Sequence, residues 1–242
     1  MKTNAYDTLK RELVRLMIEH RLESEEVVVR VAPLSPEEAI GHPEDRDYPL
    51  VIGRERLMQA EFRHSLGQAF TDSYGDFSGR LSEVAAIEPT NNFRRAIFIS
   101  SLNAVMRYLG LVTKTTHCRN NEPRQCSYEL AKYIEENYNH PKVAMIGLQP
   151  RMVEALSKRF EIKVTDMDQA NIGTEKFGVP VFGPERTQQH LEWCDVAVAT
   201  GTTIVNDTIE QCRISKPVLY YGITISGAAR LLGLNHFCRF GH

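Results

Sequence analysis

The sequence lacks a long apolar run, an excess of either charge and a regular set of cysteines. It contains no stretch of about 18 apolar residues, the length needed to cross a bilayer. Residues 1–20 also lack the apolar core of a signal peptide, so we expect a soluble, cytoplasmic protein with no membrane partner. The 29 Lys and Arg residues nearly balance the 31 Asp and Glu residues, which argues against a nucleic-acid partner. The five cysteines are odd in number and widely spaced, as is typical of free thiols in a reducing compartment.

The sequence also has no GxGxxG fingerprint, although its second half alternates strands with helices. Short apolar strands are predicted at 143–147, 162–166, 178–183, 196–200 and 217–221. Helices are predicted at 150–160, 185–194, 202–215 and 226–234. This alternation predicts a doubly wound parallel sheet with helices on both faces.

The first half mixes helices and strands in no regular order. Helices are predicted over 6–20 and 91–110, and strands over 25–34, 57–65 and 79–88. A glycine-rich turn, 67–79, is expected between the last two strands. We therefore expect an α+β unit followed by the parallel sheet, which gives the chain an α/β fold class.

Small and polar residues follow the predicted parallel strands, where ligands bind in open sheets of this kind. These residues are Gly147, Gln149, Asp166, Asp168, Thr200, Gly201, Thr202, Thr203, Asn206, Gly222 and Thr224. The glycines and hydroxyls are typical of anion-binding helix N-termini, and equally of ordinary helix caps. The two aspartates suit a ribose hydroxyl or are solvated loop residues.

The stretch TTHCRNNEPRQC, residues 115–126, is predicted to be a polar connection with little helix. It contains His117, Cys118 and Cys126, and three interpretations stay open. These residues form a metal site together with Cys238, or His117 activates Cys118 as a nucleophile, or the cysteines are buried structural residues. Cys118 and Cys126 are eight positions apart, unlike the cysteines of a zinc knuckle.

The other cysteines and histidines are assigned by their surroundings. Cys194 and Cys212 lie among apolar residues and are predicted to pack in the core. His190 lies in a polar segment and is predicted to be solvated.

Several long motifs resemble one family in order along the chain. They are GQAFTDSYGDFSGRL, AIFISSLNAVMRYLG, HCRNNEPRQC, VAMIGLQPRMVEAL, VTDMDQANIG, ATGTTIVNDTI and YYGITISGAARLLGL. The family is that of the putative heavy-metal-chelation proteins of unknown function. Gly227 stands near a position where the family often has alanine, which is a minor departure.

The resemblance implies an organisation and a set of site residues. It implies an enolase-N-terminal-like domain over 1–110, a connecting segment over 111–140 and a Rossmann-like domain over 141–242. A ligand would bind in the cleft between the two domains. Residues 67–72, Asn103 and Asn171 carry the family pattern, and we add the two asparagines to the candidate ligand-binding residues.

The function hypothesis is a heavy-metal-chelation or chelate-handling protein. It would bind a small anionic or metal-chelating ligand in the interdomain cleft, with a heavy or transition metal as the candidate cofactor. Two alternatives stay open: an enzyme that depends on S-adenosylmethionine or a dinucleotide, and a non-catalytic ligand-binding or sensing protein. Catalysis and assembly into a homo-oligomer are also left open.

Overall fold

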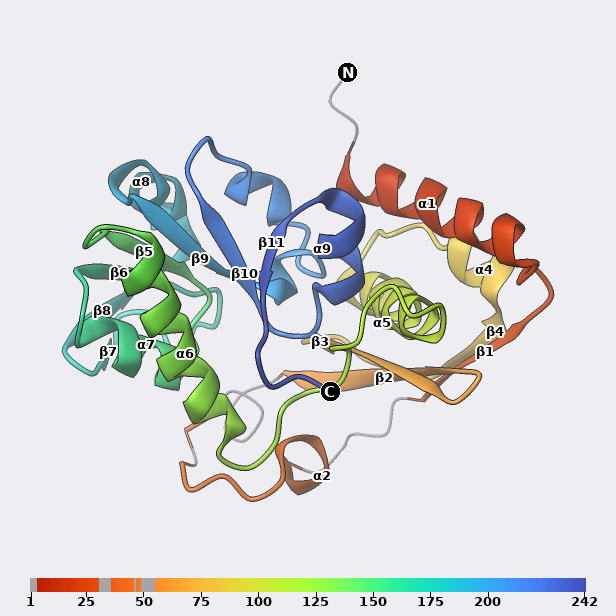
Figure 1. Cartoon of the computed structure of the whole chain (residues 1–242), viewed down its shortest axis with the longest axis horizontal. Helices are drawn as coiled ribbons and strands as arrows, with labels where there is room; N and C mark the ends of the chain where they lie inside the picture. The colour runs from red at the N-terminus through yellow and green to blue at the C-terminus, as the bar shows by residue number, and fades with distance from the viewer. Residues whose placement is uncertain (1–3, 31–35, 46, 49–54) are drawn as a thin grey trace.

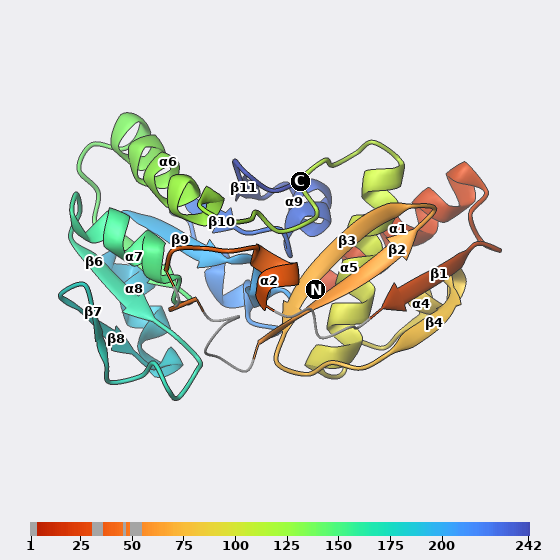
Figure 2. The ribbon, with the colours of Figure 1, turned by 90° about the horizontal axis from the view of Figure 1, so that it is seen from below.

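The computed structural model describes residues 4–30, 36–45, 47–48 and 55–242 (Figure 1). Its first half contains a four-stranded antiparallel sheet in the order β3-β2-β1-β4. The strands are β1 (Glu26–Arg30), β2 (Arg56–Phe62), β3 (Ser65–Thr71) and β4 (Phe77–Arg80). The helices of this half are α1 (Ala5–His20), α2 (Pro36–Ile40), α4 (Leu81–Ala86) and α5 (Asn92–Tyr108). Figure 2 shows α5 lying along the sheet.

The second half is built on a seven-stranded sheet in the order β11-β10-β9-β5-β6-β8-β7. Its strands are β5 (Val143–Ile146), β6 (Ile162–Thr165), β7 (Glu175–Lys176), β8 (Val179–Phe182), β9 (Val196–Thr200), β10 (Val218–Tyr221) and β11 (Asn235–Phe237). Only the β7–β8 pair is antiparallel. Its helices are α6 (Glu122–Asn137), α7 (Pro150–Ser157), α8 (Thr187–Trp193) and α9 (Ser226–Leu232), with 3-10 turns η1 (Pro184–Arg186), η2 (Gly201–Thr203) and η3 (Ile209–Cys212). The predicted α/β class and the shared sheet of the predicted parallel strands are confirmed.

The two faces of the parallel sheet have different partners, because successive side chains along a strand point to opposite faces. Val143 and Met145 of β5 pack in one cluster with residues of α6 and α7. Ala144, between them, belongs to a second cluster that also holds residues of α1 and α5. The two sheets therefore share one buried apolar core instead of each closing on its own.

The first helix is bonded to a distant part of the chain. The Tyr6 hydroxyl donates a hydrogen bond to the Ile204 carbonyl at 2.9 Å, and the Ala5 N–H donates to Glu210 Oε1 at 3.1 Å. Tyr6 is 2% exposed, so its hydroxyl bond satisfies a polar group inside the core.

An ion cluster attaches Asp45 and Asp47 to the helices of the parallel sheet. Arg124 of α6 donates to both oxygens of Asp45, with Nη2–oxygen distances of 2.8 Å. Arg151 of α7 pairs with Asp47 at 2.7 Å and with Glu154 at 2.7 Å. Because the Arg151 side chain is only 6% exposed, these carboxylates supply the counter-charge that a buried guanidinium needs.

Several predicted elements of the first half are wrong. Residues 79–88, predicted as a strand, contain the end of β4 and the helix α4. The Glu83 side chain accepts a hydrogen bond from the Arg80 N–H at 2.7 Å, and this cap favours a helix start over strand pairing. The predicted glycine-rich turn, 67–79, contains most of β3 and part of β4.

Two predictions about the second half are also wrong. The segment 202–215 forms the 3-10 turns η2 and η3 in place of one helix. Asp207, between them, has a left-handed φ of 60°, and the β-branched residues around it are poor helix formers. Residues 122–126 begin the 16-residue helix α6, so the stretch 115–126 is less irregular than predicted.

The side chain of Asn103 joins the two sheets. Asn103 lies in α5 and is fully buried. Its Nδ2 donates to the carbonyls of Gln68, Ile223 and Thr224 at 3.0–3.2 Å, and its Oδ1 accepts from the Gly227 N–H at 2.8 Å. This one amide therefore bonds β3 to the turn between β10 and α9. It was predicted to bind ligand; in the structure its amide bonds to these four backbone groups, and ligand binding stays a prediction.

Within the described ranges, no helix combines the length and apolar character needed to cross a membrane.

We expect Asn103→Leu to lower the free energy of unfolding by about 2–4 kcal/mol, because it leaves buried backbone groups without partners. Urea unfolding measures this change. The control is Asn137→Leu, since Asn137 is exposed and bonds only within α6. Equal, small effects of both substitutions would contradict the role given to Asn103.

Candidate functional site

Asp166 follows β6 at the carboxyl edge of the parallel sheet, and its carboxylate is bonded to the backbone. Oδ2 accepts from the Leu148 N–H at 2.5 Å, and Oδ1 accepts from the Asp168 N–H at 2.7 Å. The amide of Asn171 lies 3.5 Å from the same Oδ1. Asp166 therefore fixes the loops after β5 and β6, which leaves it poorly placed to bind a ribose hydroxyl.

Most of the predicted glycine and hydroxyl residues make close contacts or backbone hydrogen bonds at the carboxyl edge of the parallel sheet. Gly147 has a φ of 90°, and a Cβ there would lie 2.5 Å from Thr200 Cγ2. Thr203 donates to the Thr200 carbonyl at 2.8 Å, and Thr224 accepts from the Phe70 N–H at 3.1 Å. Gln149 Oε1 caps α7 by accepting from the Met152 N–H. These bonds account for the residue types without a ligand.

The remaining predicted residues differ in how far they are exposed. Thr202 is buried, and its hydroxyl lies 3.0 Å from that of Thr200. Gly201 is buried, and a Cβ there would lie 3.0 Å from Ile225 Cβ. Gly222 is half-buried, and its carbonyl lies 2.9 Å from His236 Nε2.

Two of the three predicted anion-binding helix N-termini belong to short segments. The turn after β9 is a 3-10 turn of three residues, and α9 has seven residues. Such short segments sum too few peptide dipoles to hold an anion by themselves.

The first half brings two carboxylates to this edge. Arg56 pairs with Thr71 in the β2–β3 ladder, so the next residues outward, Glu55 and Asp72, lie at the same sheet end. Asp72 Oδ1 accepts from the Asn92 amide at 2.8 Å. Sequence reasoning missed Glu55, because its partner is set by strand register and not by a nearby motif.

A chain of contacts continues from Asp72 to the second half. The Asn92 amide also lies 3.4 Å from Asn206 Oδ1, and Asn206 Nδ2 lies 3.8 Å from Met167 Sδ. Met167, between Asp166 and Asp168, is 52% exposed. The predicted residues Asn206, Asp166 and Asp168 are thus brought together with Asp72 of the first half.

Three aspartates at this edge act on the carboxyl group of Glu55. Burial, followed by the charges of Asp166, Asp168 and Asp72, raises the pKa of Glu55 to about 7. The half-buried Glu55 therefore carries a proton at a pH where an ordinary glutamate is ionised. We call Glu55, Asp72, Asp166 and Asp168 the carboxylate cluster.

His117 and Cys118 do not form an activated nucleophile. His117 Nδ1 lies 2.6 Å from the backbone carbonyl of Cys118, and burial lowers the pKa of His117 to about 4. Burial raises the pKa of the Cys118 thiol well above its usual value. A thiol that stays protonated, beside a ring bonded to backbone, is a poor nucleophile.

The predicted metal ligands are only partly brought together. Among the residues that the structure describes, no three His, Cys, Asp or Glu side chains form a group that could hold a metal ion. After burial, the largest cause, Cys126 and Cys238 nevertheless contribute to the raised pKa of Cys118, and Cys126 contributes to the raised pKa of Cys238. His117, Cys118, Cys126 and Cys238 therefore do not form a closed metal site.

The burial predicted for Cys194 and Cys212 is confirmed, whereas the solvent exposure predicted for His190 is not. Cys194 and Cys212 are at most 1% exposed, which confirms that they pack in the core. His190 is 3% exposed, so the prediction that it is solvated is wrong. Its ring packs edge-on against Phe182, with 5.2 Å between ring centroids.

Comparison with known proteins supports the family resemblance over part of the chain. Residues 130–228 match the model of a family, DUF364, whose description is "Putative heavy-metal chelation". The resemblance read from the motifs is thereby confirmed for this segment. None of the curated proteins matches the chain.

Two solved structures are similar to this fold. One is a DUF364-family protein of unknown function from Pyrococcus horikoshii, with a TM-score of 0.57 and 17% identity, over 91% of this chain and 79% of that one. The other is a DUF364-family protein of unknown function from Desulfitobacterium hafniense, with a TM-score of 0.52 and 14% identity, over 73% and 72%. Both support the overall architecture. The enolase-like and Rossmann-like domain names and their boundaries stay predictions.

We expect Glu55→Gln to stabilise the protein at alkaline pH. A folded-state pKa of about 7, above the ordinary 4.5, makes the wild type lose stability as pH rises through this interval. The variant should therefore exceed the wild type by on the order of 1–3 kcal/mol at about pH 8, and by much less at about pH 4.5.

Urea unfolding at both pH values measures the difference. Asp168→Asn removes one repelling charge and should show the same trend at smaller size. A Glu55→Gln variant that is equally destabilised at both pH values would refute the repulsion described above.

Proposed function

We propose that the protein binds a metal ion that is already held in a small chelate, and that the carboxylate cluster contacts the metal. The observation that carries this proposal is the meeting of carboxylates from both halves at one sheet edge. Like charges brought together in a partly buried place repel, and a cation relieves that repulsion. The family description of residues 130–228 points to the same class of ligand.

The geometry favours a chelate over a bare ion. The described residues contain no preassembled group of three metal ligands, so the protein alone offers an incomplete coordination shell. A small anionic chelator supplies the missing ligands and leaves one or two positions for protein oxygens. The chelator is then the small anionic ligand that the sequence predicts, and its metal faces the carboxylates.

Met167 supports a transition or heavy metal in this position. Its thioether is exposed between two residues of the carboxylate cluster, where a hard cation such as Mg²⁺ would gain nothing from sulfur. Asn206 and Asn92 link this methionine to Asp72, so the sulfur and the carboxylates are held in one arrangement.

A nucleotide-dependent enzyme is supported less well. Asp166 is bonded to two backbone N–H groups, and the loop after β5 has one glycine at its turn, Gly147. Both features differ from the pyrophosphate and ribose contacts of dinucleotide sites.

Calorimetric titration with Cd²⁺–citrate, with citrate alone as the reference ligand, tests the proposal. The complex should bind and citrate should not. The double variant Asp72→Asn/Asp168→Asn should bind the complex roughly tenfold or more weakly, a loss of at least about 1.4 kcal/mol. Glu161→Gln is the control, because Glu161 is exposed just before β6, at the opposite end of the strand from Asp166. Equal binding of citrate and its cadmium complex would refute a metal-directed site.

Proton release gives an independent measure of the same contact. A cation next to Glu55 lowers its pKa from about 7, so binding near that pH should release a proton. Titrations in buffers of different ionisation enthalpy count the released protons. The release should be lost in Glu55→Gln, and release that persists unchanged in that variant would place the cation elsewhere.

A further inference from the structure

An apolar groove lies on the outside of the first half, between α1 and α4. Figure 1 shows these two helices next to each other on that side of the molecule. The groove has a volume of about 370 Å³, and its floor is formed by Met17 of α1 and by Ser82, Ala85 and Ala86 of α4. A hollow of small and apolar side chains on a protein surface is typical of a site that receives another protein.

An apolar ridge stands beside this groove on the same face. Val14 and Ile18, which also line the groove, are four positions apart in α1 and are 41% and 62% exposed. Residues at this spacing share one side of a helix, and Leu9 and Leu13 bury a different side of α1 in the core. The face therefore has both a projecting ridge and a hollow, the two shapes that packed helices fit together.

The two sides of this face carry charges of opposite sign. Lys10 Nζ pairs with Glu88 Oε1 at 2.9 Å, so Lys10 lies on the α4 side of α1, and the Glu88 side chain is 69% exposed there. Arg11 is the next residue, about 100° further around the helix, which places it on the other side of the ridge. It is exposed and donates to the Thr8 hydroxyl at 3.3 Å, which uses one of its five N–H donors.

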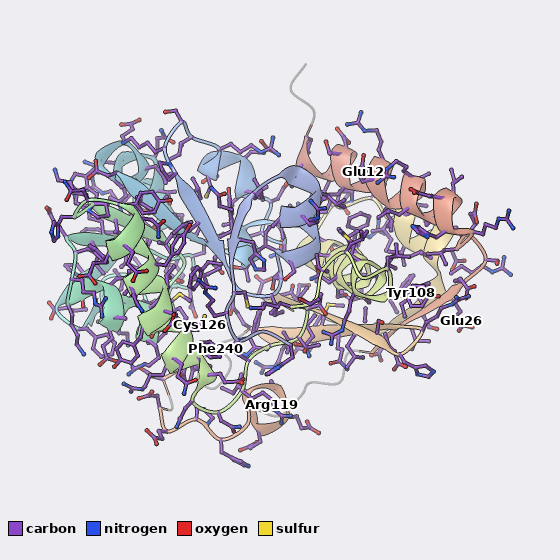
Figure 3. All side chains as sticks on the ribbon, viewed as in Figure 1. Glu12, Glu26, Tyr108, Arg119, Cys126 and Phe240 are labelled. Carbon is purple, nitrogen blue, oxygen red and sulfur yellow. The ribbon has the colours of Figure 1, made fainter. Side chains whose placement is uncertain are left out.

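The neighbouring arginine on α1 is already neutralised within its own chain. Arg15 donates to Glu12 at 3.0 Å and to Glu19 at 2.6 Å. Figure 3 labels Glu12 on α1. Arg11 therefore carries the positive charge that a partner can meet on this side, and Glu88 carries the negative charge on the other.

A second copy of the chain complements this face. In a two-fold dimer the same patch of both copies meets itself. A two-fold axis that runs along the groove keeps the position along α1 and exchanges the two sides of the face. The ridge of one copy then meets the groove of the other, and the Arg11 side meets the Glu88 side twice. An axis across the groove would instead bring like charges together.

We propose that the protein forms a two-fold homodimer through this face. The two α1 helices run parallel, the ridge of each copy enters the groove of the other, and Arg11 of each copy pairs with Glu88 of the other. This interface is separate from the carboxylate cluster and does not depend on the function proposed for it.

The size of the face sets the expected strength of association. The 16 residues of α1 span about 24 Å, and α1 and α4 together are roughly 20 Å wide. The resulting area, about 400–500 Å² per copy, is smaller than the roughly 800 Å² per partner of a standard interface. We therefore expect a dimer that forms at micromolar concentrations and dissociates on dilution.

Sedimentation of the full chain from about 1 µM to about 1 mM tests the dimer. The wild type should change from monomer to dimer over this range. Ile18→Glu should weaken association roughly tenfold or more, because it places two charges in the apolar contact. The control is Leu111→Glu, since Leu111 is also an exposed apolar residue, 38% accessible, and lies outside the groove. A wild type that stays monomeric throughout overturns the proposal.

A mixing experiment tests the relative orientation of the two copies. In low-salt buffer, Arg11→Glu and Glu88→Arg should each dimerise roughly fivefold or more weakly than the wild type, because each variant brings like charges together in its own dimer. An equal mixture of the two variants should associate as the wild type does, since both pairs are then of opposite charge. Restored association also shows that both variants fold. A mixture that associates as weakly as its components, or a wild-type dimer that Ile18→Glu leaves unchanged, contradicts the proposed interface.

Discussion

The buried amide of Asn103 is the interaction on which the relation between the two sheets depends. Its partners are all backbone groups, so it fixes the path of the chain at β3 and at the turn after β10, independently of the side chains there. Glycine makes this close approach possible. A Cβ at Gly67 would lie 2.2 Å from the Ala104 nitrogen of α5, and one at Gly227 would lie 2.9 Å from Asn103 Oδ1. The amide and the two glycines act as one steric unit.

The position of the carboxylate cluster follows from this unit. Because β3 is held against the turn after β10, its end reaches the carboxyl edge of the parallel sheet, where Asp72 meets Asp166 and Asp168. Charged side chains have two opposite kinds of surroundings in this structure. The half-buried Arg124 and the buried Arg151 each have carboxylate partners, whereas at Glu55 the neighbouring charges have the same sign. A place where a fold accepts local repulsion is where a ligand is expected to act.

Much of the parallel sheet could be predicted from sequence, and much of the candidate site could not. The strands at 143–147 and 196–200 are short apolar runs that are buried on both faces, and such runs carry their own signal. Residues 79–88 also contain a short apolar run, 84–87, but the bond between the Arg80 N–H and the Glu83 side chain favours the helix α4, and propensity alone does not reveal that choice. Cys126 was predicted to lie in an irregular connection because the polar residues around it hide the helical stripe of α6. Glu55 was missed because its neighbours come from strand register and from the other half of the chain.

The bonds of α1 also set an order of events for synthesis. Tyr6 and Ala5 bond to Ile204 and Glu210, so during synthesis α1 binds these partners only after about 200 further residues have followed it. Until then the apolar face of α1, with Leu9 and Leu13 at its centre, has no completed core to enter. Contacts of such sequence separation slow folding and prolong the exposure of apolar surface. A truncation before residue 204 should therefore leave this helix without its partners.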